Sequence, residues 1–132
     1  MTRDGVERLS TGGQWEEAFG CARAVAVGDF VLVSGCTGFV DGVLVGEGDP
    51  YEQTLTAFRI AEEALEHFRL TRADVVRTRI YLTHKRDADD VGRAHKEIFD
   101  AARPASTMVV VAGLIDSRML VEVEVEAYRG AK

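Results

Sequence analysis

Three glutamates that alternate along one stretch near the end of the chain are the residues best suited to chemistry. Glu122, Glu124 and Glu126 are separated by Val123 and Val125 within residues 120–128. On a strand, such carboxylates share one face and lie about 7 Å apart, so they repel one another. They therefore need open water, cationic partners or a site that uses one of them.

Smaller polar residues elsewhere could complete such a site. Ser106 and Thr107 follow Pro104, where hydroxyl groups either hold a ligand or satisfy the backbone of a turn. Cys21 and Cys36, beside Ser34 and Arg23, could form the floor of a pocket. The alternative is that both cysteines only fill space in the packing.

The motifs of several common enzyme classes are absent from the sequence. There is no glycine-rich dinucleotide or phosphate loop and no GxSxG, and the histidines at positions 67, 84 and 95 lack metal-ligand spacing. We therefore expect no cofactor and no metal ion. We expect His95 to be a surface or interface residue rather than a catalytic one.

Composition narrows the class of protein further. The chain has 132 residues and a net charge of −6, which offers no electrostatic footprint for nucleic acid or an anionic membrane. A local basic cluster at Arg72, Arg77 and Arg79 fits a solvated sheet edge. No apolar run approaches the ~20 residues of a membrane span, and the N-terminus lacks the apolar core of a secretory signal. We expect a cytoplasmic protein with reduced cysteines.

A hairpin is predicted to position the cysteines and Ser34. Two β-rich runs, residues 23–27 and 30–34, flank Gly28 and Asp29, which suit a two-residue turn. In that register Arg23 faces Ser34 and Cys21 faces Cys36, and these side chains point to the same side of the sheet.

The remaining elements follow from capping and periodicity. Asp49 can cap a helix that starts at Pro50, and a second helix is expected over about residues 89–101. Further strands are expected over residues 43–45, 75–82, 107–112 and 120–128, and residues 1–14 are expected to form a loosely held lead-in. The order predicts one α+β domain over residues 1–132, with an about six-stranded mixed sheet and two helices on one face.

The second face of that sheet predicts self-association. Residues 30–33 and 108–111 are apolar on both strand faces, and two helices can cover only one face. We expect neighbouring subunits to cover the other face. Glu122 and Glu124 then lie on the intersubunit side, where carboxylates are retained only if they are paired, hydrogen-bonded or functional.

Several segments taken together resemble the RidA/YjgF family of imine and enamine deaminases. They are residues 31–35 (VLVSG), the helix after Asp49, residues 74–81 (DVVRTRIY), residues 103–109 (RPASTMV) and residues 120–124 (LVEVE). The resemblance covers about residues 20–128. It implies a chorismate-mutase-like subunit, a homotrimer, and small-molecule sites between subunits.

The resemblance also implies roles for particular residues. Family deaminases hydrolyse 2-imino or 2-enamino acids without a cofactor, and Glu122, with Glu124 as the alternative, matches their acid/base glutamate. Ser34 and Gly35 match the serine-glycine pair that lines the pocket. Two positions depart from the family pattern, because Ser106 replaces the arginine that binds the substrate carboxylate and Cys21 replaces a pocket aromatic.

These departures make the chain similar to divergent Rid subgroups that lack the standard deaminase arginine. A bidentate arginine is poorly replaced by hydroxyl groups such as those of Ser106 and Thr107. Arg103 and Arg23 are the candidates to compensate. The sequence thus predicts an enzyme acting on a small imine, enamine or related carbonyl compound, with a non-catalytic trimer that binds a metabolite or a partner as the alternative.

Overall fold

The computed structural model describes residues 2–3 and 5–130 of the chain. Its helices and strands form an α+β fold. In chain order these elements are β1 Thr2–Arg3, β2 Val6–Leu9, α1 Gln14–Phe19, β3 Ala24–Val27, β4 Phe30–Cys36, β5 Phe39–Val40, β6 Val43–Leu44, α2 Pro50–His67, β7 Val75–Leu82, α3 Ala88–Phe99, β8 Ala105–Val110 and β9 Val121–Tyr128.

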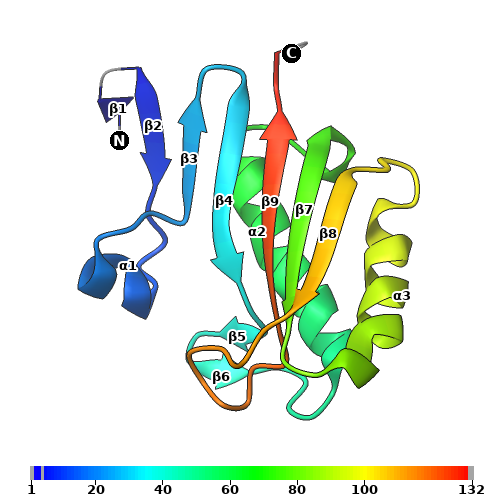
Figure 1. Cartoon of the computed structure of the whole chain (residues 1–132). Coiled ribbons are helices and arrows are strands. Elements are labelled where there is room, and N and C mark those ends of the chain that lie inside the picture. Colours follow the sequence, from blue (N-terminus) through cyan, green and yellow to red (C-terminus); the bar gives the residue numbers. More distant parts are fainter. Residues whose placement is uncertain (1, 4, 131–132) are drawn as a thin grey trace.

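One mixed sheet carries the fold. Its seven strands run in the order β1-β2-β3-β4-β9-β7-β8. Five of them are strands that the sequence predicts, whereas β1 and β2 are additional. The strand predicted at residues 43–45 forms β6, which pairs with β5 in a separate two-stranded sheet. Strands β7 and β8 are parallel and the other neighbours are antiparallel. Helices α2 and α3 lie together on one face of this sheet, and the other face carries no helix (Figure 1). The predicted architecture is confirmed.

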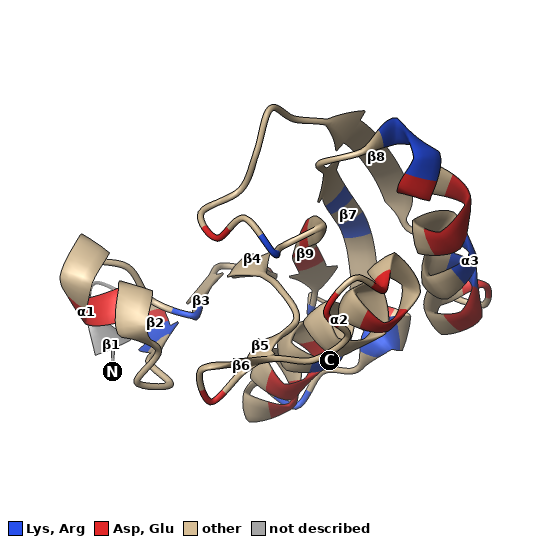
Figure 2. Ribbon diagram, turned by 90° about the horizontal axis from the view of Figure 1, so that it is seen from below, with Lys and Arg blue, Asp and Glu red and all other residues tan. Residues whose placement is uncertain are grey.

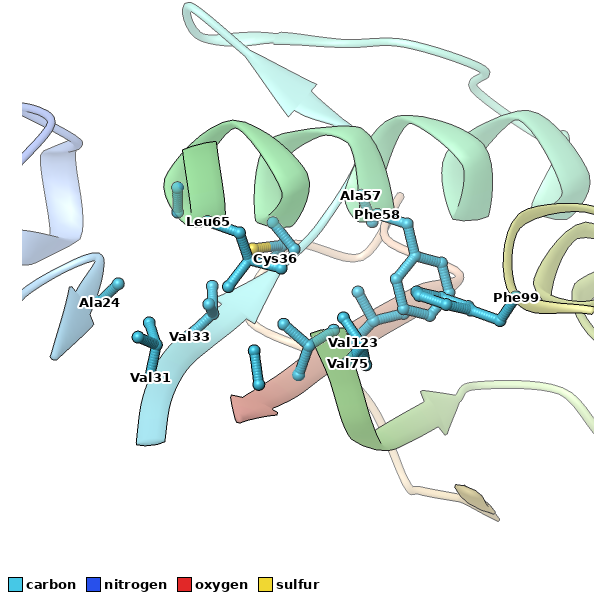
Figure 3. Close-up of a cluster of buried hydrophobic side chains, with 14 of the residues drawn as sticks. Ala24, Val31, Val33, Cys36, Ala57, Phe58, Leu65, Val75, Phe99 and Val123 are labelled. Carbon is cyan, nitrogen blue, oxygen red and sulfur yellow. The ribbon is translucent and has the colours of Figure 1, made fainter. Parts of the chain in front are cut away.

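The long helix α2 begins where the sequence predicts. The Asp49 side chain accepts a hydrogen bond from the backbone N–H of Glu52 at 3.1 Å, and Pro50 occupies the first turn. Its buried face, which includes Phe58 and Leu65, meets inward side chains of the sheet such as Val123 (Figure 3). Because the inward valines of β9 are almost completely buried, the predicted alternation of that strand is also confirmed.

The β3–β4 hairpin keeps its predicted register as far as Arg23 and Ser34, where the backbone N–H of Ser34 donates to the Arg23 carbonyl at 2.9 Å. Val27 pairs with Phe30 and Ala24 with Val33, but β4 has a bulge between Val33 and Cys36. The extra residue turns the Cys36 side chain to the helix side, where it lies beneath α2 and is 1% exposed (Figure 3). The expectation that Cys21 and Cys36 face each other on one side of the sheet is therefore wrong.

The first residues are more ordered than the sequence suggests. Strand β2 pairs antiparallel with β3, so residues 6–9 belong to the sheet and are not a loosely held lead-in. Glu16 of the short helix α1 secures the loop between them, since it accepts hydrogen bonds from Ser10 Oγ and from the backbone and hydroxyl of Thr11. Backbone pairing and this polar cluster order the segment, although it lacks the apolar periodicity from which strands and helices are predicted.

Strand β8 lies at one edge of the sheet, and β1 lies at the other. It begins at Ala105, two residues earlier than predicted, because its backbone pairs in parallel with β7 from Arg77 onward. The helix before it ends at Phe99 rather than near residue 101. Within residues 2–3 and 5–130, no helix combines the length and apolar character needed to cross a membrane.

Candidate functional site

The glutamates of β9 stand on the sheet face that carries no helix, and two of them have partners on β7. The guanidinium of Arg79 forms an ion pair with Glu126 at 3.0 Å. The Tyr81 hydroxyl donates a hydrogen bond to Glu124 at 2.8 Å. Strand β9 lies between β4 and β7 (Figure 1, Figure 2), so a side chain of this row has a neighbouring strand on each side. Two of the three carboxylates are thus stabilised by their neighbours.

Glu122 leans the other way, toward the bulge of β4. A Cβ atom built on Gly35 would lie 1.9 Å from Glu122 Oε2 and 2.8 Å from its Cδ, so the carboxylate rests directly against the glycine backbone. Within the described residues Glu122 forms no hydrogen bond or ion pair with another side chain. The structure therefore brings Gly35 and Glu122 together and leaves the carboxylate of Glu122 available.

The surroundings of Glu122 favour its protonated form. Burial raises the pKa of this carboxyl group, and the nearby negative charge of Glu124 raises it further, while the positive charge of Arg23 opposes both. Arg23 is held close by two hydrogen bonds, from Nη1 to the Gly35 carbonyl at 3.0 Å and to Cys36 Sγ at 3.2 Å. A carboxyl group with a raised pKa can exchange a proton closer to neutral pH, as an acid/base catalyst requires.

Two hollows adjoin helix α1 and the residues just before β3. A hollow of ≈ 1050 Å³ is lined by Cys21 and Ser34, together with Arg8 and Glu17. A second hollow of ≈ 660 Å³ is lined by Arg23 and by residues of α1 and α2. Neither of these two hollows is lined by Glu122.

The side chains of Ser34, Cys21 and Cys36 lie in different surroundings. Ser34 Oγ donates a hydrogen bond to the Ala22 carbonyl at 2.7 Å. Cys21 is an exposed thiol, 3.7 Å from the Trp15 carbonyl, and Cys36 is a buried one. Burial raises the pKa of the Cys36 thiol to about 11, which keeps it protonated. Of the two cysteines, only Cys21 is accessible to a ligand.

The residues after α3 lie away from Glu122 in the same chain. Ser106 pairs with Thr78 and so faces the helix side, whereas Thr107 pairs with Arg79 and faces the glutamate side. The Arg103 guanidinium is 74% exposed and binds Asp100 at 2.8 Å. Because β7 separates β8 from β9, these residues can approach Glu122 only from another copy of the chain.

Sequence reasoning missed several residues that the structure connects to the site. Tyr81 and Arg79 lie on an interior strand, so the basic cluster is not a solvated sheet edge as expected. His95 is also not a simple surface residue, since it is half-buried and its Nε2 lies 2.8 Å from the hydroxyl of buried Thr78. The alternation over residues 75–82 places Arg79 and Tyr81 on one face of a strand. Only the register between β7 and β9 shows that these side chains lie beside the glutamates.

Comparisons with known proteins identify the family of the chain. The family model described as Endoribonuclease L-PSP matches residues 17–129. An uncharacterized protein of Streptomyces coelicolor, SCO2049, is 60% identical over 131 residues, which are 99% of this chain and 98% of that protein. A RutC family protein of Pyrococcus abyssi is 30% identical over 110 residues, which are 82% of this chain and 85% of that protein.

Solved structures extend the similarity to the whole fold. Rv2704 of Mycobacterium tuberculosis, a member of the YjgF/YER057c/UK114 family, is 41% identical with a TM-score of 0.84, and the match covers 93% of this chain and 98% of that one. The conserved Rid family protein YyfA of Yersinia pestis is 25% identical with a TM-score of 0.76, over 81% and 86% of the two chains. The subunit has the chorismate-mutase-like fold. On these matches, the chain belongs to the YjgF/RidA family.

Proposed function

We propose that this protein is a homotrimer with small-molecule sites between subunits, and that it hydrolyses an imine, an enamine or a related small carbonyl compound. The single observation that carries the proposal is the Glu122 carboxylate, which rests against Gly35 and has no side-chain partner among the residues that the structure describes. Membership of the YjgF/RidA family is consistent with this class of reaction.

The uncovered sheet face supports the trimer. Apolar side chains that are 40–45% exposed lie on it, namely Val27, Phe30, Leu32, Val76, Val109 and Tyr128. A patch of this kind on a small chain is typical of a surface that another protein copy covers. Sedimentation velocity should give a trimer for the wild type, and Leu32→Glu should shift it toward monomer. A wild type that sediments as a monomer at micromolar concentration would contradict this part of the proposal.

The proposed chemistry uses Glu122 as both base and acid. Its carboxylate accepts a proton from water while the water oxygen bonds to the C=N carbon. The protonated carboxyl group then donates that proton to the nitrogen, which gives a carbinolamine. The carboxylate next takes the hydroxyl proton of the carbinolamine and passes it to the nitrogen, so that the C–N bond breaks, the C=O bond forms and ammonia leaves. The raised pKa of Glu122 suits it to hold the proton between these steps.

This site has few groups available to bind a substrate carboxylate. Arg103 is engaged with Asp100, and Ser106 has no charge to offer. Arg23 is closer to Glu122, but it already donates to Gly35 and Cys36. We therefore expect low activity on 2-imino acids in the wild type, and an increase on restoring the cation with Ser106→Arg.

A coupled assay of 2-iminopropanoate and 2-iminobutanoate hydrolysis tests the proposal. Glu122→Gln should lower turnover of any accepted substrate by about 10²-fold or more, because it removes the acid/base group. Glu126→Gln is the matched control, since it removes a carboxylate of the same strand face that is paired with Arg79. Equal turnover in wild type and Glu122→Gln would mean that Glu122 is not the acid/base group.

The second candidate is a non-catalytic trimer that binds a metabolite or a partner. The observation that favours it is Ser106, which has no charge and faces away from the glutamate row of its own chain. A ligand retained by the purified trimer without being converted would support this alternative. RNA cleavage, which the description of the family model suggests, fits poorly with a net charge of −6 and a row of carboxylates.

A further inference from the structure

The hollow of ≈ 660 Å³ that Arg23 borders lies beside helix α2, on the helix side of the sheet. Helices α1 and α2 stand apart in Figure 1 and Figure 2, and residues of both line this hollow. Its volume is within the range of small-molecule sites, about 300–1,000 Å³. It can hold an apolar body, because five separate segments contribute an apolar wall, namely Leu9, Trp15, Phe39, Val40, Ile60 and Met119.

The same hollow is lined by the guanidinium-bearing residue Arg23, which is half-buried. Arg23 Nη1 donates to the Gly35 carbonyl at 3.0 Å and to Cys36 Sγ at 3.2 Å. Among the residues that the structure describes, Nε and Nη2 have no hydrogen-bond partner and no carboxylate lies within 4 Å of this guanidinium. A cation partly withdrawn from water gains from charge-assisted hydrogen bonds to a carboxylate. The hollow therefore offers an anion a partner that the described part of the chain leaves without one.

The other charged residues of the lining stand at exposed positions. Asp41 and Glu63 are negative, and His67 Nε2 lies 3.5 Å from a carboxylate oxygen of Glu7. Water and salt screen charges at such positions, whereas a half-buried charge is screened less. Arg23 therefore favours a bound anion more than Asp41 and Glu63 oppose it.

Arg23 also connects this hollow to the candidate site. Its guanidinium is bound to the Gly35 carbonyl, and the Glu122 carboxylate rests against Gly35. Burial and the charge of Glu124 raise the pKa of Glu122, and the positive charge of Arg23 opposes them. An anion bound to Arg23 would cancel part of that positive charge, so the pKa of Glu122 would rise. Occupancy of the hollow thus changes the protonation of Glu122 without contact between the ligand and Glu122.

We propose that this hollow is a second ligand site, for a small aromatic carboxylic acid, and that Arg23 transmits its occupancy to Glu122. The carboxylate of the ligand binds Arg23, and its ring packs against the apolar wall that includes Trp15. The site goes beyond the proposed function, since it supplies no group to the hydrolysis. Its ligand regulates the protein by shifting Glu122 toward the protonated form.

Trp15 is the only tryptophan of the chain, so its fluorescence reports occupancy of the hollow. We would titrate 3-phenylpropanoate and its uncharged analogue 3-phenylpropanamide into the wild-type protein at about 0.15 M salt. The carboxylate should change the emission with a Kd about tenfold or more below that of the amide, because only the carboxylate gains charge-assisted hydrogen bonds to Arg23. Equal Kd values, tighter binding of the amide or no change of emission with either probe would overturn the site.

Two exposed positions of α2 locate the site with little risk to the fold. Glu63 lines the hollow, whereas Glu66, one turn further along, does not. Glu63→Lys should lower the Kd of 3-phenylpropanoate by about threefold, and Glu66→Lys, the matched control, by less than about twofold. Arg23→Gln keeps a donor for the Gly35 carbonyl and should bring the two Kd values to within about twofold of each other. An unchanged Kd in Glu63→Lys, or an unchanged preference for the carboxylate in Arg23→Gln, would contradict the assignment.

Carboxyl ¹³C NMR of Glu122 tests the transmission. Saturating 3-phenylpropanoate should move the titration of Glu122 to higher pH, and the saturating amide should leave it in place. In Glu63→Lys the same shift should appear at a correspondingly lower probe concentration. Neither this measurement nor the fluorescence titration needs turnover, so both are independent of whether the protein hydrolyses an imine. An unchanged Glu122 titration in the protein saturated with the carboxylate would show that Arg23 transmits nothing.

Discussion

Replacing Gly35 with alanine tests the contact on which the candidate site depends. The new Cβ would lie 1.9 Å from Glu122 Oε2, and ordinary van der Waals contact begins at 3.4 Å, so the oxygen has to move by about 1.5 Å. Gly35 does not have a positive φ angle, so the alanine backbone itself is not strained. The change therefore displaces the carboxylate and little else.

A displacement of this size is large for a catalytic group. Misplacement by about 1 Å can lower a rate by about 10²-fold, so Gly35→Ala should reduce turnover by about that factor. The free energy of unfolding, measured with urea, should change by less than about 1 kcal/mol, because the end of a glutamate side chain can rotate away. The titration of Glu122, followed by carboxyl ¹³C NMR, should change as well.

Gly92 offers the matched control. It lies inside α3, and a Cβ there would meet nothing within 4 Å. Gly92→Ala should raise the free energy of unfolding by about 0.5–1 kcal/mol through helix propensity, and it should leave turnover unchanged. If Gly35→Ala kept both wild-type turnover and the wild-type Glu122 titration, the inferred contact between Gly35 and the carboxylate would be wrong.

Three further changes probe other parts of the structure. Tyr81→Phe removes the hydrogen bond to Glu124 and should lower the free energy of unfolding by about 1–2 kcal/mol in urea titrations; no loss would mean that Glu124 is equally well solvated without it. Burial acts to raise the pKa of Glu16, but hydrogen bonds from its loop outweigh burial, so the pKa lies below 4.5. The folded state therefore gains stability from Glu16 at pH values above its ordinary pKa, and this gain is lost as the pH falls through the lowered pKa of the folded state. Glu16→Gln should flatten the loss of stability in acid, measured by thermal unfolding. An unchanged pH profile would contradict the assignment. Cys21 should react with iodoacetamide in the native protein and Cys36 only in denaturant, because a buried thiol with a pKa of about 11 forms little thiolate. Mass spectrometry identifies the labelled cysteine. Labelling of Cys36 in the native protein would contradict its burial.

Local patterns were enough to predict most of the fold. The start of α2 follows from Asp49 and Pro50, and the inward face of β9 follows from alternation with Glu122, because capping and strand periodicity depend on residues close in sequence. The first part of the β3–β4 hairpin follows from its two-residue turn for the same reason. The three-glutamate row was therefore recognisable before any tertiary structure was known.

The tertiary structure decided which of those carboxylates is available. The bulge that turns Cys36 inward and sets Gly35 against Glu122 is defined by pairing with β9, about 90 residues further along the chain, and no local pattern encodes such a register. The faces of Ser106 and Thr107 likewise depend on the parallel pairing with β7. By itself the sequence determined which residues share a strand face. Only the packing of distant strands decided which of them meet, because contact requires both register and side, and each is a property of two segments together.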